Sequence, residues 1–307
     1  MKKNFIITVD TEGDNQWNIY NGQDITTENA NFIPRFQEMC EGFGFKPVYL
    51  VNYEMANNDF LMDYLKKKQK EGVCEIGTHL HSWNSPPEHE LERKFEGNPY
   101  ITEYPEQIVY EKIDFMTKLI ESKVGIRPVV HRAGRWASSD CMFDILSELG
   151  YIADCSVVSG CNMLNYPGKT VSYGFDYRTY PNEAYLVKDN LIEIPMTVKH
   201  IQHTLAGKSI KNRAKNLIVG KDRWLRPAIS TVKEMKLNID ERVENGSDYA
   251  EFMIHSTELM PGGSPYFKNS RDVEREYKDM RTIFTYAVQC GFEGITMRDY
   301  AKKFLEK

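Results

Sequence analysis

Residues 5–14, FIITVDTEGD, join a short apolar run to three carboxylates within five residues. An apolar run of this length between polar segments is typical of a buried strand, predicted here over Phe5–Val9. Side chains two apart on an extended chain point the same way, so Asp10 and Glu12 share a face. Asp14 is expected to cap a helix or to lie in a solvated loop. Because clustered carboxylates repel each other, a cation or an arginine is expected beside Asp10 and Glu12.

Similar apolar runs recur along the chain and alternate with longer segments of helical spacing. The predicted strands are Phe5–Val9, Val48–Val51, Val73–Gly77, Pro128–Val130, Tyr151–Cys155, Leu191–Ile194, Phe252–Ile254 and Gly294–Thr296. The predicted helices are Phe32–Glu41, Phe60–Lys70, Glu106–Ser122 and Cys141–Leu149. This alternation favours an α/β fold with a parallel sheet or barrel. No repeat or linker interrupts it, so residues 1–307 are expected to form a single domain.

Ionisable side chains stand just past the carboxyl ends of five predicted strands. The carboxyl ends of parallel strands meet at one edge, which is where α/β barrels build their active sites. One such residue would carry little information, but five indicate a common site. The residues are Asp10, His79 with His81, His131 with Arg132, Asp154 and His255.

The sequence THLH at residues 78–81 is the strongest local signal for a metal ion. His79 and His81 are two apart, so both imidazoles can reach one ion. Two imidazoles and a carboxylate suit one divalent ion, Zn²⁺ above all, with Co²⁺, Ni²⁺ and Mn²⁺ as alternatives. An isolated HxH is more often a pair of structural histidines. The carboxylates Asp10 and Glu12 at another strand end reverse that preference.

Arg132 and His255 supply the other groups that hydrolysis requires. An arginine can hold a carboxylate such as Asp10 ionised and oriented as a base. A histidine directly after an apolar strand is placed to donate a proton to a leaving group. Taken alone, either residue would more often be structural.

The composition bounds the class of protein. The chain has 307 residues, 41% hydrophobic and 27% charged, with a formal net charge of −5. These values exclude a disordered chain and disfavour a nucleic-acid binder, which would carry a basic footprint. No apolar run is long enough for a transmembrane segment, and no secretory leader is recognisable. Six cysteines without a CxxC pair are typical of reduced thiols, so the expected location is cytoplasmic. The oligomeric state is open.

The order of these motifs resembles the polysaccharide deacetylase superfamily, also described as NodB-homology or carbohydrate esterase 4-like. The resemblance is carried by VDTEGD at residues 9–14, by GTHLHSWN at residues 77–84 and by the strand-end residues that follow. The two motifs are most similar to the cytoplasmic branch named WalW in surface-polysaccharide gene clusters. The resemblance covers most of the chain, apart from residues 156–245. It implies a distorted (β/α)7 barrel that removes acetyl groups from sugars with a divalent metal.

Carried over residue by residue, the resemblance implies a catalytic role for three side chains. Asp10 would be the base, Arg132 the residue that orients it, and His255 the general acid. The implied metal ligands are Glu12, His79 and His81. Because other branches have Asp-Asp or Asp-x-Asp in the first motif, the roles of Asp10 and Glu12 could be exchanged.

Two motifs depart from the family pattern. The second histidine usually lies four residues after the first, but Trp83 stands there and His81 lies only two residues on. The Pro-Tyr that usually follows the motif arginine is replaced by Gly134 and Arg135, which alters the substrate wall. His131 is expected to make a structural hydrogen bond. The implied substrate-binding residues are Trp83, Arg135, Trp136 and Asp154.

The expected substrate is an acetylated sugar, a cytoplasmic precursor of a surface polysaccharide, with the acetyl group on nitrogen or oxygen. Residues 199–226 form a basic insertion with eight lysines and arginines against one aspartate. A solvated helix face is the simpler explanation of such a segment. The alternative is that its cations hold a nucleoside diphosphate or lipid pyrophosphate attached to the sugar.

Three other functions compete with this interpretation. A metal-dependent hydrolase of a non-sugar amide would use the same site, and a catalytically degenerate sugar-binding protein would explain the missing histidine at position 83. A metal-free glycosidase is disfavoured because Asp10 and Glu12 lie on one side of the chain and could not flank a glycosidic bond. The stoichiometry of bound metal separates the enzyme from a degenerate binder.

Overall fold

The structure is a computed structural model that describes residues 3–16, 24–201 and 220–306. Its centre is a nine-stranded sheet in the order β10-β1-β2-β3-β4-β5-β7-β6, with β11 paired to β1. All pairs are parallel except β6 with β7. The strands are β1 Lys3–Thr11, β2 Val48–Val51, β3 Glu75–Leu80, β4 Val130–Ala133, β5 Ala153–Asp154, β6 Tyr185–Lys188, β7 Leu191–Glu193, β10 Tyr249–His255 and β11 Phe292–Gly294.

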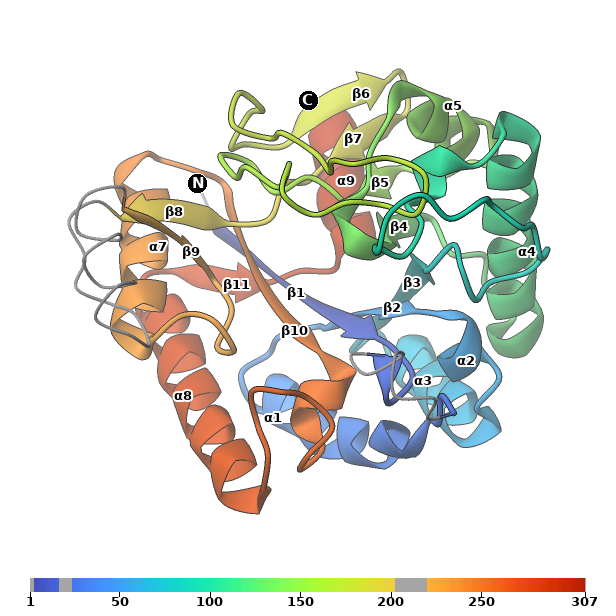
Figure 1. The fold of residues 1–307 in the computed structure, drawn as a ribbon. Helices are drawn as coiled ribbons and strands as arrows, with labels where there is room; N and C mark the ends of the chain where they lie inside the picture. The colour runs from blue at the N-terminus through green and yellow to red at the C-terminus, as the bar shows by residue number, and fades with distance from the viewer. Residues whose placement is uncertain (1–2, 17–23, 202–219, 307) are drawn as a thin grey trace.

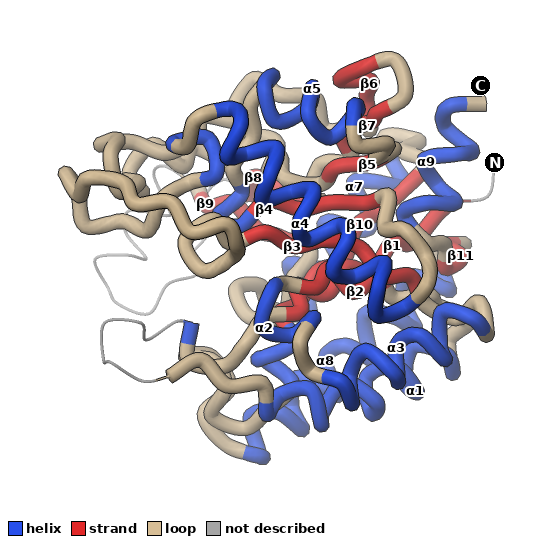
Figure 2. Tube along the Cα trace, turned by 90° about the vertical axis from the view of Figure 1, so that its right-hand side faces the viewer, coloured by secondary structure: helices blue, strands red, loops and turns tan. Residues whose placement is uncertain are grey.

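Helices surround this sheet (Figures 1 and 2), because the strands leave apolar side chains on the outer face. The helices are α1 Ile33–Gly42, α2 Tyr53–Ala56, α3 Asp59–Lys70, α4 Glu106–Val124, α5 Asp140–Glu148, α7 Val232–Glu244, α8 Ser270–Gln289 and α9 Met297–Leu305. Among the described residues, no helix is long and apolar enough to cross a membrane.

The path from β10 through β5 to β7 comprises seven parallel strands, and the sheet curls along it. No strand pair joins β7 to β10 within the described residues. Instead the segment after β7 bridges the two strands, because the Tyr249 hydroxyl donates to the Pro195 carbonyl at 2.8 Å and the Glu251 amide donates to Thr197 Oγ1 at 2.9 Å. The predicted distorted (β/α)7 barrel is confirmed, and its distortion lies at this open seam.

The alternation of side chains along β1 separates two buried layers. Phe5, Ile7 and Val9 pack into the large core under the surrounding helices, whereas Ile6 belongs to a second cluster on the inner face. The second cluster also contains side chains of β2, β4, β5, β7 and α9, so α9 fills the apolar interior at one end. Full burial of each such side chain contributes roughly 1.5–3 kcal/mol to folding. Polar side chains occupy the inner face farther along β1.

Most predicted elements occur at or near their expected positions, with shifts at the ends. The strand Val48–Val51 has its predicted bounds, and the four predicted helices correspond to α1, α3, α4 and α5. β1, β3, β4 and β10 run past their predicted carboxyl ends, so several ionisable residues expected beyond the strands lie within them. They are Asp10, His79, His131, Arg132 and His255. Gly and Pro near the strand starts had suggested the earlier bounds. The sequence pattern did not predict α2, β6, α7, α8 or α9.

Part of the basic segment forms a separate two-stranded antiparallel sheet, β8 Val198–Ile201 with β9 Lys221–Trp224. Lys199 pairs with Glu241, and Arg223 pairs with Glu234, so these cations are engaged in ion pairs. Residues 202–219, with four of the eight basic side chains, lie outside the described residues. The single domain with a basic insertion stays a prediction.

Glu75, at the start of β3, carries a carboxylate that folding keeps from water. Its side chain is 3% exposed, accepts the Arg298 amide at 3.0 Å and lies 3.3 Å from Arg298 Nε. Burial raises the pKa of Glu75 to about 7 against the partial opposition of Arg298. The folded chain therefore holds a proton that the unfolded chain has already released.

We expect Glu75→Gln to flatten the pH dependence of stability. The contribution of Glu75 is fully present below its ordinary pKa of 4.5 and is lost as the pH rises through about 7. The free energy of unfolding, measured by urea denaturation, should fall between about pH 5 and about pH 8 in the wild type. This fall should exceed that of the variant by on the order of 2–3 kcal/mol. The matched control is Glu244→Gln on the exposed side of α7. Equal pH dependence in the wild type and Glu75→Gln would contradict the assignment.

Candidate active site

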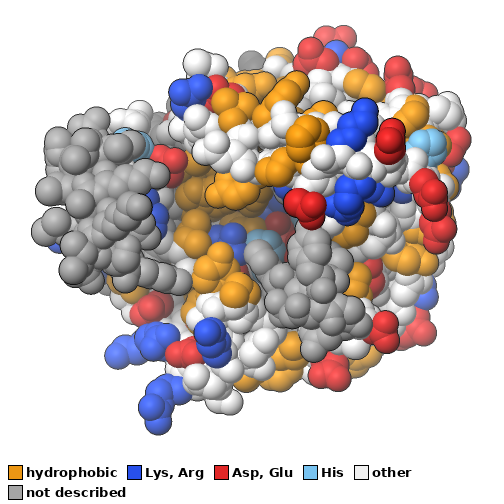
Figure 3. All heavy atoms as spheres, viewed as in Figure 1, with side chains coloured by type: hydrophobic (Ala, Val, Ile, Leu, Met, Phe, Trp, Pro, Cys, Tyr) orange, Lys and Arg blue, Asp and Glu red, His pale blue; other side chains and the backbone are white. Residues whose placement is uncertain are grey.

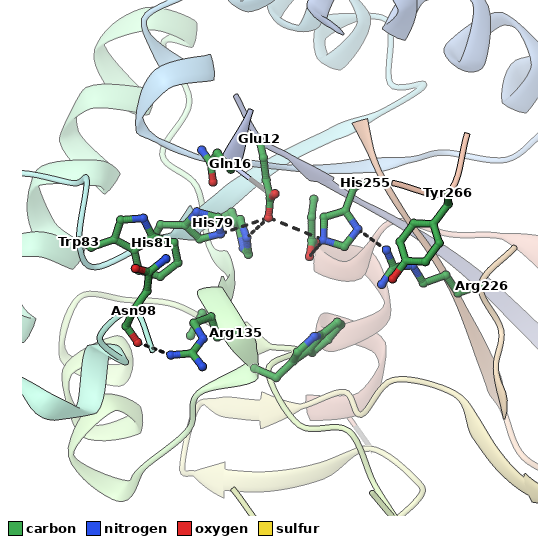
Figure 4. Close-up of a pocket in the computed structure, with 13 residues that line it drawn as sticks. Glu12, Gln16, His79, His81, Trp83, Asn98, Arg135, Arg226, His255 and Tyr266 are labelled. Carbon is green, nitrogen blue, oxygen red and sulfur yellow. Dashed lines mark hydrogen bonds and ion pairs between the residues drawn. The ribbon is translucent and has the colours of Figure 1, made fainter. Parts of the chain in front are cut away.

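A cavity of about 330 Å³ opens at the carboxyl ends of the parallel strands (Figures 3 and 4). Residues at the carboxyl ends of β1, β3, β4 and β10, and from the segment that follows β9, line this cavity. Its lining comprises Asp10, Glu12, Gln16, His79, His81, Trp83, Asn98, Ala133, Arg135, Trp136, Arg226, His255 and Tyr266.

Glu12, His79 and His81 offer ligand atoms that lie within 4.8 Å of one another. Glu12 Oε1 is 2.9 Å from His79 Nε2 and 3.1 Å from His81 Nε2. All three side chains are buried. Hydrogen bonds between the Glu12 backbone and the Ser256 side chain fix the loop after β1. The two imidazoles therefore converge on one carboxylate oxygen, as Figure 4 shows.

The hydrogen bonding of His79 suits a ligand of a divalent ion. Its Nδ1 lies 3.0 Å from the carbonyl oxygen of Arg132, which can only accept, so the Nδ1 proton is donated there. In the neutral ring Nε2 then carries a lone pair directed at Glu12. Ligating histidines commonly donate their other ring proton to a carbonyl in this way. The donor set of two imidazoles and one carboxylate fits a Zn²⁺-like ion.

Asp10, Glu12 and His255 form a second group with ligand atoms within 4.8 Å. Arg226 distinguishes it from the first, because its Nη2 donates to His255 Nδ1 at 2.8 Å and a guanidinium has no acceptor. The neutral His255 ring must then carry its proton on Nε2, which lies 3.8 Å from Asp10 and 3.7 Å from Glu12. A nitrogen that carries a proton cannot ligate a cation, so the geometry favours His255 as a hydrogen-bond donor through Nε2.

Burial by itself would raise the pKa of Asp10 and of Glu12 and so favour their neutral forms. Burial raises the pKa of Glu12, but the positive charges that His81 and His255 carry when protonated, with hydrogen bonds from protonated His79 and His81, outweigh it and hold that pKa well below its usual range. Burial also raises the pKa of Asp10, and the Arg132 guanidinium is the main influence that lowers it below its usual value. Both side chains are therefore carboxylates at neutral pH.

Arg132 is fully buried and links three strands of the barrel. Its Nη1 donates to Asp10 Oδ1 at 2.6 Å and to Thr8 Oγ1 at 3.0 Å, while its Nη2 pairs with Glu251. Nε donates to the Cys155 carbonyl at 3.0 Å. Such charge-assisted bonds set the direction of the Asp10 carboxylate.

The segment after β4 approaches the ligand group closely. A methyl group on Gly134 would lie 2.4 Å from His81 Cδ2, so glycine is required for this approach. Arg135 and Trp136 have positive φ angles of 60° and 58°, a conformation that costs non-glycine residues energy and is concentrated at functional sites. Trp83 stacks on His81 with ring centroids 4.5 Å apart. Trp83 therefore holds the His81 ring by stacking on its face, next to Glu12.

Three of the four predicted substrate-binding residues, Trp83, Arg135 and Trp136, line the cavity. The structure does not bring Asp154 there. Its side chain is fully buried and lies 2.6 Å from His131 Nδ1, which gives His131 the structural hydrogen bond that was expected. Asp154 is the last residue of β5, and its carboxylate is engaged by His131 and Ser156, so it does not line the cavity.

The sequence analysis missed several residues of the site. Arg226 was counted only as part of the basic segment, and Glu258, which accepts from it, was not noted. Glu251 pairs with Arg132 from inside β10. The spacing of Glu258 from His255, three residues within a turn, was the available signal. Asn98 and Tyr266 come from loops without any motif.

No protein-family profile and no curated protein matches the sequence. Solved structures do resemble the fold. A candidate polysaccharide deacetylase from Mycobacterium smegmatis has a TM-score of 0.58 at 13% identity, covering 99% of this chain and 91% of that chain. Peptidoglycan deacetylase PdaC from Bacillus subtilis has a TM-score of 0.44 at 13% identity, covering 99% of this chain and 94% of that chain. A CE4 family pseudoenzyme from Bacillus anthracis has a TM-score of 0.48 at 9% identity, covering 98% of this chain and 66% of that chain.

The similarity to the Mycobacterium smegmatis protein extends over almost the whole of both chains, so it concerns the complete barrel. At 13% identity it establishes the architecture and leaves the activity to be argued from the residues of the site. The two other structures add nothing to this conclusion. The chain has the fold of the polysaccharide deacetylase superfamily, as the motif resemblance implied.

Proposed function

We propose that this chain is a metal-dependent deacetylase of an acetylated saccharide. The observation that carries the proposal is the convergence of Glu12, His79 and His81 beside an arginine-held Asp10, with His255 on the opposite side of the cavity. Figure 4 shows these groups around one space. Hydrolysis of an acetyl group requires a base, an electrophile and a proton donor, and each has a candidate here.

Of the two carboxylates in the cavity, we assign one to the metal-ligand group and the other to the base. Glu12 lies against both imidazoles, whereas Asp10 is turned toward Arg132, which supports Glu12 as the ligand and Asp10 as the base. The ion, when bound, supplies Lewis-acid polarisation of the acetyl carbonyl and lowers the pKa of water. Asp10 then accepts the proton of the attacking water, and Arg132 keeps this carboxylate in place.

His255 is the proposed hydrogen-bond donor to the leaving group, and Arg226 is its positioning residue. The Arg226 hydrogen bond holds the His255 proton on Nε2, the nitrogen that faces Asp10 and Glu12. Nε2–H donates a hydrogen bond to the departing nitrogen or oxygen of the sugar. As the bond to the acetyl carbon breaks, this atom takes the proton that Asp10 accepted from water, which restores the Asp10 carboxylate. Glu258 accepts from Arg226, so the guanidinium keeps its orientation.

The walls of the cavity support a saccharide rather than a non-sugar amide. Trp83 and Trp136 line it, and indole rings suit the apolar faces of sugars. Arg135 also lines it and donates to the carbonyls of Asn98 and Pro167, which leaves its charge without a carboxylate partner among the described residues. We keep the sugar as a cytoplasmic precursor of a surface polysaccharide in the proposal; its support is the motif resemblance and the six free cysteines.

We expect the purified chain to bind one Zn²⁺ ion and to release acetate from an acetylated saccharide. Chelation should abolish acetate release, and added Zn²⁺ should restore it. Glu12→Ala and His81→Ala should each weaken Zn²⁺ binding by on the order of 100-fold, measured by calorimetry, because each removes a ligand. The matched control is His200→Ala, whose exposed imidazole pairs with Asp222 far along the chain from these ligands.

The competing functions give other results. A chain that binds saccharide but neither Zn²⁺ nor Co²⁺ would be a degenerate sugar-binding protein. Acetate release from simple amides at the same rate as from saccharides would favour the non-sugar amidohydrolase.

We expect Arg226→Met to lower kcat by roughly 100-fold with little change in KM, because His255 loses the bond that fixes its tautomer. Arg226→Lys, which keeps a donor and the charge opposite Glu258, should recover part of the loss. Nitrogen-15 NMR should show the proton on Nε2 of His255 in the wild type and a mixture of tautomers in Arg226→Met. A wild-type ring protonated on Nδ1 would contradict this role for Arg226.

A further inference from the structure

A second cavity, of about 340 Å³, adjoins the one described above. Trp83 and Asn98 line both, so the two cavities share a wall. In Figure 4 these two side chains lie on the same side of the first cavity, opposite His255 and Arg226. A saccharide whose acetylated unit occupies the first cavity can therefore extend past Trp83 and Asn98 into the second.

Two ammonium groups of the second cavity lack carboxylate partners. Lys112 is 1% exposed, and its Nζ donates to the carbonyls of Ser85 and Pro87 at 2.5 Å each. An ammonium has three donors, so one is not used by these carbonyls. Lys169 is half-buried in the facing loop. Among the described residues, no carboxylate oxygen lies within 4.0 Å of either Nζ.

The burial of Lys112 has an electrostatic cost that the protein does not offset with a paired carboxylate. Burial lowers the pKa of Lys112 to about 8, and the charge of Glu88 opposes this shift only in part. Buried charges are normally paired, because an unpaired one loses its hydration without compensation. An anion entering the cavity would supply the missing partner.

Hydrogen-bond donors without partners also occur in this lining. Ser85 Oγ and Trp83 Nε1 are buried and have no partner among the described residues. The Ser85 side chain is 3% exposed. An indole N–H donates only, and a hydroxyl can donate, so this set matches a group that accepts. Apart from tyrosines, the remaining ionisable lining consists of Glu88, His89, Glu90 and Arg93, all of which are exposed.

We propose that the second cavity binds an anionic group of the substrate, a carboxylate or a phosphate, on the unit next to the acetylated sugar. Lys112 and Lys169 provide the charge, and Trp83 and Ser85 provide neutral donors. The proposal rests on the proposed deacetylase function and narrows its substrate to acidic acetylated saccharides. It places the anion site on loops near β3, whereas the sequence pattern had offered the basic segment 199–226 as an alternative anion site.

The test follows the indole N–H signals of nitrogen-15-labelled, metal-free full-length protein. The chain has 4 tryptophans, and Trp83→Phe identifies the Trp83 signal. Titration with glucuronate and with inorganic phosphate should shift that signal, whereas glucose should not. The stronger of the two ligands tells whether the anion is a carboxylate or a phosphate. Lys169→Met should weaken binding of that ligand about 10-fold, the value of one charge-assisted hydrogen bond.

The matched control is Lys94→Met, an exposed lysine outside the lining whose backbone amide bonds to the Lys169 carbonyl. It should bind the anion as the wild type does. With an active enzyme, Lys169→Met should also lower kcat/KM for an acidic acetylated saccharide about 10-fold and leave a neutral one unchanged.

Failure of the anion site and failure of the proposed function are distinguishable. If neither anion shifts the Trp83 signal, or if Lys169→Met and Lys94→Met bind alike, the anion site is wrong even when neutral saccharides are deacetylated. If anions bind as expected but no acetylated saccharide releases acetate, the anion site stands and the deacetylase function is wrong.

Discussion

The buried guanidinium of Arg132 is the interaction on which the site depends. It donates to Asp10 and Thr8 of β1, pairs with Glu251 of β10 and donates to the carbonyl that follows β5. One side chain from β4 thus ties together strands that the sheet alone would hold only through their neighbours. Removing one partner of such a buried pair commonly costs 3–5 kcal/mol, because the remaining charge is left without compensation. The same contacts aim the base, so the stability and the chemistry of the barrel share one group.

A second principle of the site is that fixed donors and acceptors decide what each imidazole can do. A carbonyl oxygen beside His79 takes its Nδ1 proton and leaves Nε2 able to bind a cation. A guanidinium beside His255 donates to Nδ1 and leaves the proton on Nε2. Two rings of the same residue type therefore receive opposite roles within one cavity.

One carboxylate and two glycines contribute to holding together the loops that line the second cavity. Glu103 accepts hydrogen bonds from the backbone or side chains of Tyr100, Lys169 and Thr170. A methyl group on Gly97 would lie 1.8 Å from the Pro167 carbonyl oxygen, and one on Gly168 would lie 2.0 Å from Glu103 Oε1. These loops carry Asn98 and the carbonyls that hold Arg135, so substrate recognition depends on contacts between segments about 70 residues apart.

Local pattern predicted the strands of the main sheet other than β6, the first four long helices and the two motifs, because apolar periodicity and i, i+2 spacing depend only on neighbouring residues. It also indicated that Asp10, Glu12, His79, His81 and His255 would meet, since parallel strands share one carboxyl edge. Tertiary structure alone decided that Asp154 is buried beside His131 outside the cavity lining, and that Arg226 reaches both His255 and Glu258. These outcomes depend on where each strand ends and on loops that pack across the barrel, and such long-range contacts leave no periodic trace in the sequence.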